Sequence, residues 1–188
     1  MNKSQITRNK IIETALHLFS EKGYQAITMK DICEKSGLSR GGVYRYFSST
    51  KEIFLALLDR DIKDDTAEVE QAIQNKVSVH VILDHYFEHE KELILGAQRG
   101  LYYAMHEFAF AEPDQRQYFD DRVRESLTLI GNIFKYGQDN GEFKKFDIPS
   151  TALHIIYFFN AMKTSASVLT ITEEMVDQQI GIIREMII

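Results

Sequence analysis

Residues 28–47 read TMKDICEKSGLSRGGVYRYF, a pattern that predicts two short helices joined by a tight turn. The hydroxyl of Thr28 can cap the first helix, and Asp31 in its first turn complements the helix dipole. Gly37 can adopt the left-handed backbone conformation that ends a helix, and Ser39 can then cap the second helix. Apolar residues at positions 27, 32, 38, 43 and 47 are spaced to meet inside this corner. The cations between them then point outward, which indicates a DNA-binding surface.

Three motifs follow one another in this N-terminal part. F-x-x-K-G-Y occupies positions 19–24, T-x-x-x-I positions 28–32, and G-L-S-R-G-G-V-Y-R-Y-F positions 37–47. Their order resembles the DNA-binding domain of TetR-type transcriptional regulators. The detailed resemblance covers about the first 55 residues, and the remainder is similar in length and helical character. It implies an all-α fold, with a three-helix helix-turn-helix domain over residues 1–48 and a larger helical ligand-binding and dimerisation domain over residues 49–188.

The composition is typical of a soluble globular protein: of 188 residues, 44% are hydrophobic and 27% are charged. The net charge is −6, yet residues 1–50 hold eight Lys or Arg against four acidic residues, so this part is +4 and the remainder −10. Such a split places the attraction for phosphate at one end of the chain. The sequence has no apolar run long enough to span a bilayer and no signal-peptide core, which predicts a cytoplasmic protein without a membrane partner.

Hydrophobic periodicity predicts helices over residues 4–22, 29–36, 50–72, 78–96, 99–110, 113–139, 149–169 and 172–186, and a short helix after residue 39. Gly23, Gly96 and Gly100 interrupt the apolar pattern, and Pro113 and Pro149 are suited to the first turns of the helices that follow them. The single cysteine in the sequence excludes an intrachain disulfide and cannot form a thiolate metal site by itself.

The candidate DNA contacts gather in and beside the second helix of the corner. Arg40 opens that helix, where a guanidinium can donate two hydrogen bonds to guanine, while Arg45 can contact a base or a phosphate. Gly41 and Gly42 each cost about 1 kcal/mol in a helix relative to alanine, which makes sense if the backbone approaches DNA closely; glycines merely tolerated in a supported helix are the alternative. The predicted contacts are Thr28, Lys30, Ser39, Arg40, Gly41, Gly42, Tyr44, Arg45, Tyr46, Thr50 and Lys51.

Some of these contacts rest on the resemblance alone. Tyr44 and Tyr46 match aromatic positions whose hydroxyls contact phosphates in the resembled family, with partial burial as the alternative for Tyr46. Thr50 stands where the family has a lysine that contacts phosphate. Lys51 can substitute for that lysine, but it projects about 100° further round the helix, so its phosphate contact is an open question.

Aromatic and histidine side chains are frequent between residues 79 and 119, where the resemblance implies a ligand-binding domain. Aromatic walls with a few polar tips suit a small planar ligand. The predicted lining is Tyr86, His89, Tyr102, Tyr103, His106 and Phe119. One alternative is a solid aromatic core, and another is a metal site using His85, His89 and His106. The aromatic surroundings favour hydrogen-bonded histidines, so neither a metal nor a cofactor is expected.

The last two predicted helices carry apolar residues on more than one face, which indicates that a second partner covers them. In the resembled family, these helices form a four-helix bundle with their copies in a dimer. The predicted interface is Ile156, Phe159, Lys163, Ile180, Ile183 and Ile187. A monomer in which these faces belong to the core is the alternative.

Together these observations predict a homodimeric transcriptional repressor. It would bind a near-palindromic operator in double-stranded DNA and be released by a small-molecule inducer, whose identity the sequence does not reveal. The sequence contains no recognisable set of nucleophile, base and orienting group, so no enzymatic activity is expected. The alternatives are a DNA-binding regulator that needs no ligand and a helical small-molecule- or metal-binding enzyme.

Overall fold

The computed structural model describes residues 2–97 and 99–188, apart from the side chains of residues 60–65. Helices make up most of this part of the chain, and it contains no strand. The elements are α1 (Lys3–Lys22), α2 (Met29–Ser36), α3 (Arg40–Tyr44), α4 (Thr50–Gln74), α5 (Val79–Leu95), α6 (Gly100–Ala111), the 3-10 turn η1 (Pro113–Gln115), α7 (Arg116–Asp139), α8 (Ile148–Ser165) and α9 (Glu173–Ile187). The predicted all-α fold is confirmed.

Two boundaries differ from the prediction for local reasons. Pro113 opens the separate turn η1, and α7 begins only at Arg116. Proline suits the first position of such a turn because the N–H that it lacks would have no partner there. α8 ends at Ser165 rather than Leu169. The T-S-A-S run at residues 164–167 has no long apolar side chain to bury, and Val168 and Leu169 stay exposed.

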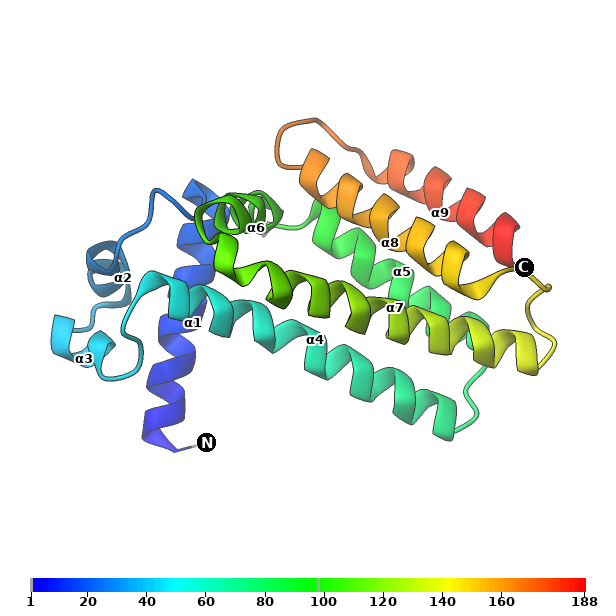
Figure 1. Cartoon of the computed structure of the whole chain (residues 1–188), viewed down its shortest axis with the longest axis horizontal. Coiled ribbons are helices and arrows are strands. Elements are labelled where there is room, and N and C mark those ends of the chain that lie inside the picture. Colours follow the sequence, from blue (N-terminus) through cyan, green and yellow to red (C-terminus); the bar gives the residue numbers. More distant parts are fainter. Residues whose placement is uncertain (1, 98) are drawn as a thin grey trace.

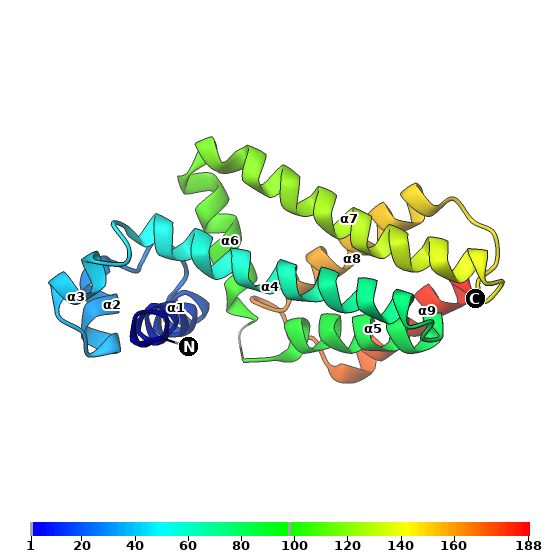
Figure 2. The ribbon, with the colours of Figure 1, turned by 90° about the horizontal axis from the view of Figure 1, so that it is seen from below.

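The helices form two groups that meet at α6. α1, α2 and α3 gather at one end, whereas α4, α5, α7, α8 and α9 run along one another through the rest of the molecule (Figure 1). In the perpendicular view, α6 lies across the long helices (Figure 2), and it packs closely against α1. Gly100 permits this approach, because a Cβ at this position would lie 2.0 Å from the carbonyl oxygen of Ser20. α6 is therefore held directly against the N-terminal group.

Two hydrophobic cores stabilise the fold. The first contains an aromatic cluster of Phe19, Tyr24, Phe54 and Phe108. The ring centroid of Phe54 lies 4.9 Å from that of Phe19 and 4.7 Å from that of Phe108. Because Phe54 belongs to α4 and Phe108 to α6, the core of the N-terminal group continues beyond residue 48, the predicted domain boundary. The second core joins α5, α7, α8 and α9.

The six residues predicted for the dimer interface lie inside the fold. Ile156, Phe159, Lys163, Ile180, Ile183 and Ile187 are each at most 8% exposed within one chain. Because other helices of the same chain cover them, they offer no face to a partner, and this choice of interface residues needs correction. The large apolar side chains that α8 and α9 do expose are Leu153, Tyr157, Met175, Ile182 and Met186.

Candidate DNA-binding and ligand-binding sites

Local hydrogen bonds fix the corner between α2 and α3. Thr28 Oγ1 accepts from the backbone N–H of Asp31 at 3.3 Å, and Asp31 Oδ2 accepts from that of Thr28 at 2.8 Å. Hydrogen bonds from Thr28 hold the pKa of the Asp31 carboxyl below its usual value. Gly37 ends α2 with φ at 68°, in the left-handed region. Ser39 Oγ accepts from the N–H of Gly42 at 3.1 Å. The predicted caps are all formed, and they use the side chains of Thr28 and Ser39 within the chain.

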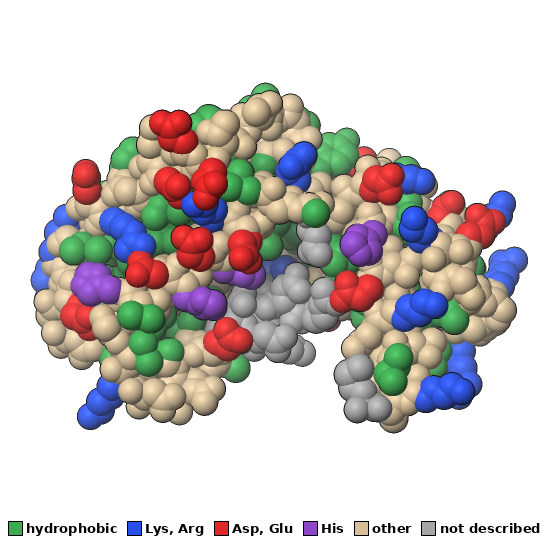
Figure 3. All heavy atoms as spheres, turned by 180° about the vertical axis from the view of Figure 1, so that it is seen from behind, with side chains coloured by type: hydrophobic (Ala, Val, Ile, Leu, Met, Phe, Trp, Pro, Cys, Tyr) green, Lys and Arg blue, Asp and Glu red, His purple; other side chains and the backbone are tan. Residues whose placement is uncertain are grey.

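The outer surface of this corner is cationic. Lys30, Arg40 and Arg45 are exposed, and Lys and Arg side chains project from this end of the molecule (Figure 3). The guanidinium carbon of Arg40 lies 5.3 Å from the ring centroid of Tyr44, which is 42% exposed. This contact restricts the Arg40 side chain while leaving it at the surface. Lys30 pairs with Glu34 one turn on at 3.7 Å, a fully solvated contact that holds it only weakly.

Gly41 and Gly42 have different surroundings. A Cβ at position 42 would lie 3.2 Å from Ser39 Oγ, so the N-cap of α3 favours glycine there. A Cβ at position 41 would meet nothing within 4 Å, and Gly41 is exposed. The chain itself therefore gives no packing reason for glycine at position 41, which fits both the close approach of DNA and the alternative of a glycine that the helix tolerates.

Tyr46 and Lys51 contact the protein itself. The Tyr46 ring packs against the first core, and a hydrogen bond with Ser4 lowers the pKa of its hydroxyl, as the partly buried alternative describes. Lys51 Nζ lies 2.7 Å from Asp114 Oδ2 and 2.9 Å from Glu112 Oε2. Hydrogen bonds to these two carboxylates raise the pKa of Lys51. Two acidic partners hold the Lys51 ammonium within the chain, which argues against its predicted role as the substitute phosphate contact.

Tyr24 connects the corner to α6. Its backbone N–H donates to Glu107 Oε2 at 2.6 Å, and its hydroxyl donates to Glu112 Oε1 at 3.2 Å. Burial, together with the Glu112 carboxylate, raises the pKa of Tyr24 to about 12, so the hydroxyl keeps its proton and acts as a donor. Thr50 at the start of α4 also hydrogen-bonds this hydroxyl. No local pattern marked the connection between Tyr24 and α6, because these partners are more than 80 residues apart.

A cavity of about 1040 Å³ lies between α4, α5, α6, α7 and α8. Five of the six predicted ligand residues line it, namely Tyr86, His89, Tyr102, His106 and Phe119. Tyr103 does not line it and is 46% exposed. Tyr103 projects about 100° further round α6 than Tyr102, which turns it out of the cavity and toward the surface. A cavity of this size does not fit the solid-core alternative.

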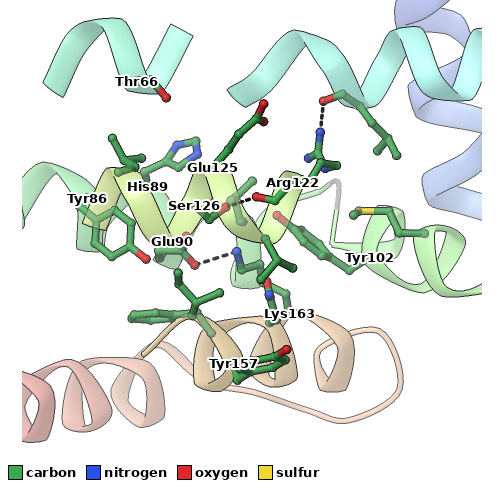
Figure 4. A pocket seen from close by; sticks show the side chains of 18 of the residues that line it. Thr66, Tyr86, His89, Glu90, Tyr102, Arg122, Glu125, Ser126, Tyr157 and Lys163 are labelled. Carbon is green, nitrogen blue, oxygen red and sulfur yellow. Dashed lines mark hydrogen bonds and ion pairs between the residues drawn. The ribbon is translucent and has the colours of Figure 1, made fainter. Parts of the chain in front are cut away.

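Charged side chains that were not predicted as ligand contacts also line the cavity (Figure 4). Lys163 Nζ lies 2.8 Å from Glu90 Oε2, and Arg122 Nη1 donates to the carbonyl oxygen of Leu58 at 2.6 Å. Glu125 lines the same cavity. Lys163, predicted for the dimer interface, is thus part of the cavity wall. Glu90 belongs to the run EHEKE at residues 88–92, whose charges are typical of a solvated helix face, so no sequence signal marked it.

The histidines of this region have partners in different places. His85 Nε2 lies 3.7 Å from Glu68 Oε2, and His106 Nε2 lies 2.9 Å from Thr164 Oγ1. Within residues 2–97 and 99–188, as far as their side chains are described, no three or more His, Cys, Asp or Glu residues are grouped to hold a metal ion. The geometry of these residues gives no support to the metal alternative.

Comparison with known proteins decides the family. Residues 11–57 match the family described as bacterial regulatory proteins, tetR family. The helix-turn-helix-type transcriptional regulator YfiR of Bacillus subtilis is 30% identical over 138 residues, which cover 72% of this chain and 67% of the relative. The chain belongs to the TetR family. This TetR-family chain is also 25% identical over 173 residues to the transcriptional repressor KstR2 of Mycobacterium tuberculosis, covering 86% of this chain and 79% of that one.

Solved structures share the fold of this TetR-family chain over nearly its whole length. A TetR-family regulator from Syntrophomonas wolfei has a TM-score of 0.76 at 22% identity, covering 98% of this chain and 96% of that one. A transcriptional regulator from Saccharomonospora viridis in complex with choline has a TM-score of 0.76 at 20% identity, covering 96% and 95%. The chain is thus a DNA-binding transcriptional regulator of the TetR family. None of its described helices is long and apolar enough to cross a membrane.

Proposed function

We propose that two copies of this TetR-family protein bind a near-palindromic operator in double-stranded DNA and repress transcription. The observation that carries the proposal is the capped corner with Arg40 packed on Tyr44, both exposed at α3. Arg40 then reads guanine in the major groove, where a guanidinium can donate to O6 and N7. Lys30 and Arg45 contact phosphates or neighbouring base edges, and Gly41 lets the backbone of α3 come close to the DNA.

A dimer is part of the proposal because one short recognition helix buries too little surface for specific binding. Two copies can dock in successive major grooves, about 34 to 36 Å apart. The interface proposed for the dimer is the exposed apolar face of α8 and α9, formed by Leu153, Tyr157, Met175, Ile182 and Met186. A face of this kind on a surface is typical of a protein–protein contact.

We further propose that a small molecule in the cavity releases the operator through α6. Tyr102 and His106 of α6 line the cavity, whereas Glu107 of the same helix holds the backbone of Tyr24 beside the corner. A ligand that favours a different position of α6 therefore also moves the corner, and it shifts the equilibrium by as much as its affinities for the two positions differ. The repressor named among the relatives and the choline complex of a protein with this fold support the proposal.

Binding of the purified protein to DNA from upstream of its own gene tests this function. Fluorescence anisotropy should show that this DNA binds about a thousandfold or more tightly than a shuffled sequence of equal length and composition at the same salt concentration. Equal affinity for the two DNAs would contradict sequence-specific binding. A footprint of the protein on this DNA that covers only one half-site would contradict the proposed dimer.

A further inference from the structure

The cavity wall contains a buried ion pair that the DNA-binding function does not use. Lys163 of α8 and Glu90 of α5 contact each other at 2.8 Å, with side chains only 7% and 10% exposed, and both line the cavity. The ammonium also lies 4.9 Å from the ring centroid of Tyr102. Burial alone would lower the pKa of Lys163, but Glu90 and Tyr102 raise it overall, so the amine carries its charge. Burial raises the pKa of Tyr102, whose hydroxyl stays protonated.

This pair keeps hydrogen-bonding capacity. Glu90 Oε2 is buried and lies 2.8 Å from the Lys163 ammonium, and within the described part of the chain no second donor reaches it. A carboxylate oxygen can accept two hydrogen bonds, so the ion pair with Lys163 leaves room for another donor. A ligand that donates a hydrogen bond to Glu90 can use this capacity. Lys163 has three N–H groups, so it can also donate to the same ligand.

The charge of the pair selects the kind of ligand group. A carboxylate beside Lys163 would also lie beside Glu90, and an ammonium beside Glu90 would also lie beside Lys163. Because the pair is neutral overall, either ion would lose its hydration without a net countercharge. A hydroxyl has no charge to desolvate, and it can accept from Lys163 while donating to Glu90.

The remaining wall indicates what the hydroxyl is attached to. Apolar and aromatic side chains dominate around the pair, among them Leu93, Val123, Leu129, Ile156 and Phe159. Three other charged residues line the cavity among the described side chains: Arg122 and Glu125, of opposite sign and one helical turn apart on α7, and Glu68, whose Oε2 lies 3.7 Å from His85 Nε2. Arg122 is in addition bonded to the backbone of α4. The cavity therefore favours a ligand with a large apolar body and no net charge.

We propose that the ligand of this cavity is an uncharged, mainly apolar alcohol or phenol whose hydroxyl inserts between Lys163 and Glu90. This inference rests on the proposed ligand-released function and names the chemical class of its ligand.

Four probes of one shape test the chemistry: 4-phenylphenol, 4-methylbiphenyl, biphenyl-4-carboxylate and 4-phenylbenzylamine. Equilibrium dialysis at neutral pH should show that 4-phenylphenol binds about tenfold or more tightly than each of the others, because only its hydroxyl satisfies both partners. The inference is overturned if the methyl compound binds as well as the phenol, if either ion binds better, or if none of the four binds.

A substitution at Glu90 should reverse the order of probe affinities, a result that loss of folding cannot produce. Glu90→Gln keeps the size of the side chain but leaves the Lys163 charge uncompensated, so the preference should change from 4-phenylphenol to biphenyl-4-carboxylate. Glu92→Gln is the matched control: it makes the same change on the same helix, at an exposed position outside the cavity lining. The control should keep the preference of the unchanged protein. An unchanged preference in Glu90→Gln would overturn the assignment.

The same samples separate this inference from the proposed function. If 4-phenylphenol binds with the expected preference but leaves the operator complex intact, the release mechanism fails and the ligand class stands. If operator binding is specific but the dialysis shows no preference for the hydroxyl, the ligand class fails and the DNA-binding proposal stands.

Discussion

Lys51 Nζ lies 2.9 Å from Glu112 Oε2, which joins the first turn of α4 to the end of α6. Asp114 in η1 completes the contact at 2.7 Å. Tyr24 reaches Glu112 from the loop before α2, so one carboxylate receives donors from this loop and from α4. The Lys51 amine, which was predicted to contact DNA, thus holds the corner against α6. This arrangement makes α6 the shared element of the DNA-binding corner and the cavity.

The salt dependence of DNA binding should distinguish Lys51 from Arg45. Lys51→Gln should leave the slope of log K against log salt unchanged, because this amine already has two acidic partners. Arg45→Gln should reduce the slope by about one, the loss expected for one phosphate contact. Anisotropy titrations at several salt concentrations measure both slopes. A reduced slope for Lys51→Gln would mean that Lys51 leaves its carboxylates and contacts phosphate.

Arg40→Ala should weaken binding to the operator by about 1 to 3 kcal/mol and leave binding to shuffled DNA nearly unchanged, because a base contact adds specificity. Lys135→Ala removes an exposed cation from the far end of α7 and serves as the charge-matched control. Competition titrations with both DNAs provide the measurement. Equal losses on operator and shuffled DNA would show that Arg40 contacts phosphate only.

Introducing glutamate at one exposed and one buried position should distinguish the dimer face from the core. Ile182 is 51% exposed, so Ile182→Glu should produce a folded monomer that has lost operator binding. Phe159 is 1% exposed, so Phe159→Glu should unfold the chain by burying a charge. Sedimentation velocity and circular dichroism measure assembly and folding. A folded dimer in Ile182→Glu would place the interface on another face.

Neighbouring tyrosines of α6 should respond differently to truncation. Tyr102→Ala should lower the free energy of unfolding by about 2 to 3 kcal/mol, because it removes a partly buried ring from the cavity wall. Tyr103→Ala should cost less than about 1 kcal/mol, since Tyr103 is 46% exposed and outside the cavity lining. Urea unfolding of both variants tests this contrast. Similar losses would mean that Tyr103 packs against a surface absent from the single chain.

The helices could be predicted because their caps and apolar periods are local. Ser49 and Glu52 have the spacing of a capping box, and Ser49 Oγ accepts from the N–H of Glu52 at the start of α4. Even there, the Glu52 carboxylate accepts from Ser48 rather than Ser49, a detail that side-chain spacing cannot settle.

The cavity and the dimer face could be predicted only in part, because they depend on which helices become neighbours. Periodicity marked Phe159 and Lys163 as one stripe of α8, but the stripe faces α5 of the same chain. The partner of Lys163 is Glu90, 73 positions away in a run of charges, and only the packed fold brings the two together.

Selection of bound DNA from a random double-stranded library tests the central claim most directly, since it needs no knowledge of the operator or the ligand. The account predicts enrichment of a near-palindrome whose two half-sites have centres about one helical turn, roughly 34 to 36 Å, apart or a multiple of it. It also predicts that the Arg40→Ala variant still binds DNA from the library but no longer enriches this motif. Recovery of unrelated sequences by the unchanged protein, or of a single half-site without its inverted copy, would contradict it.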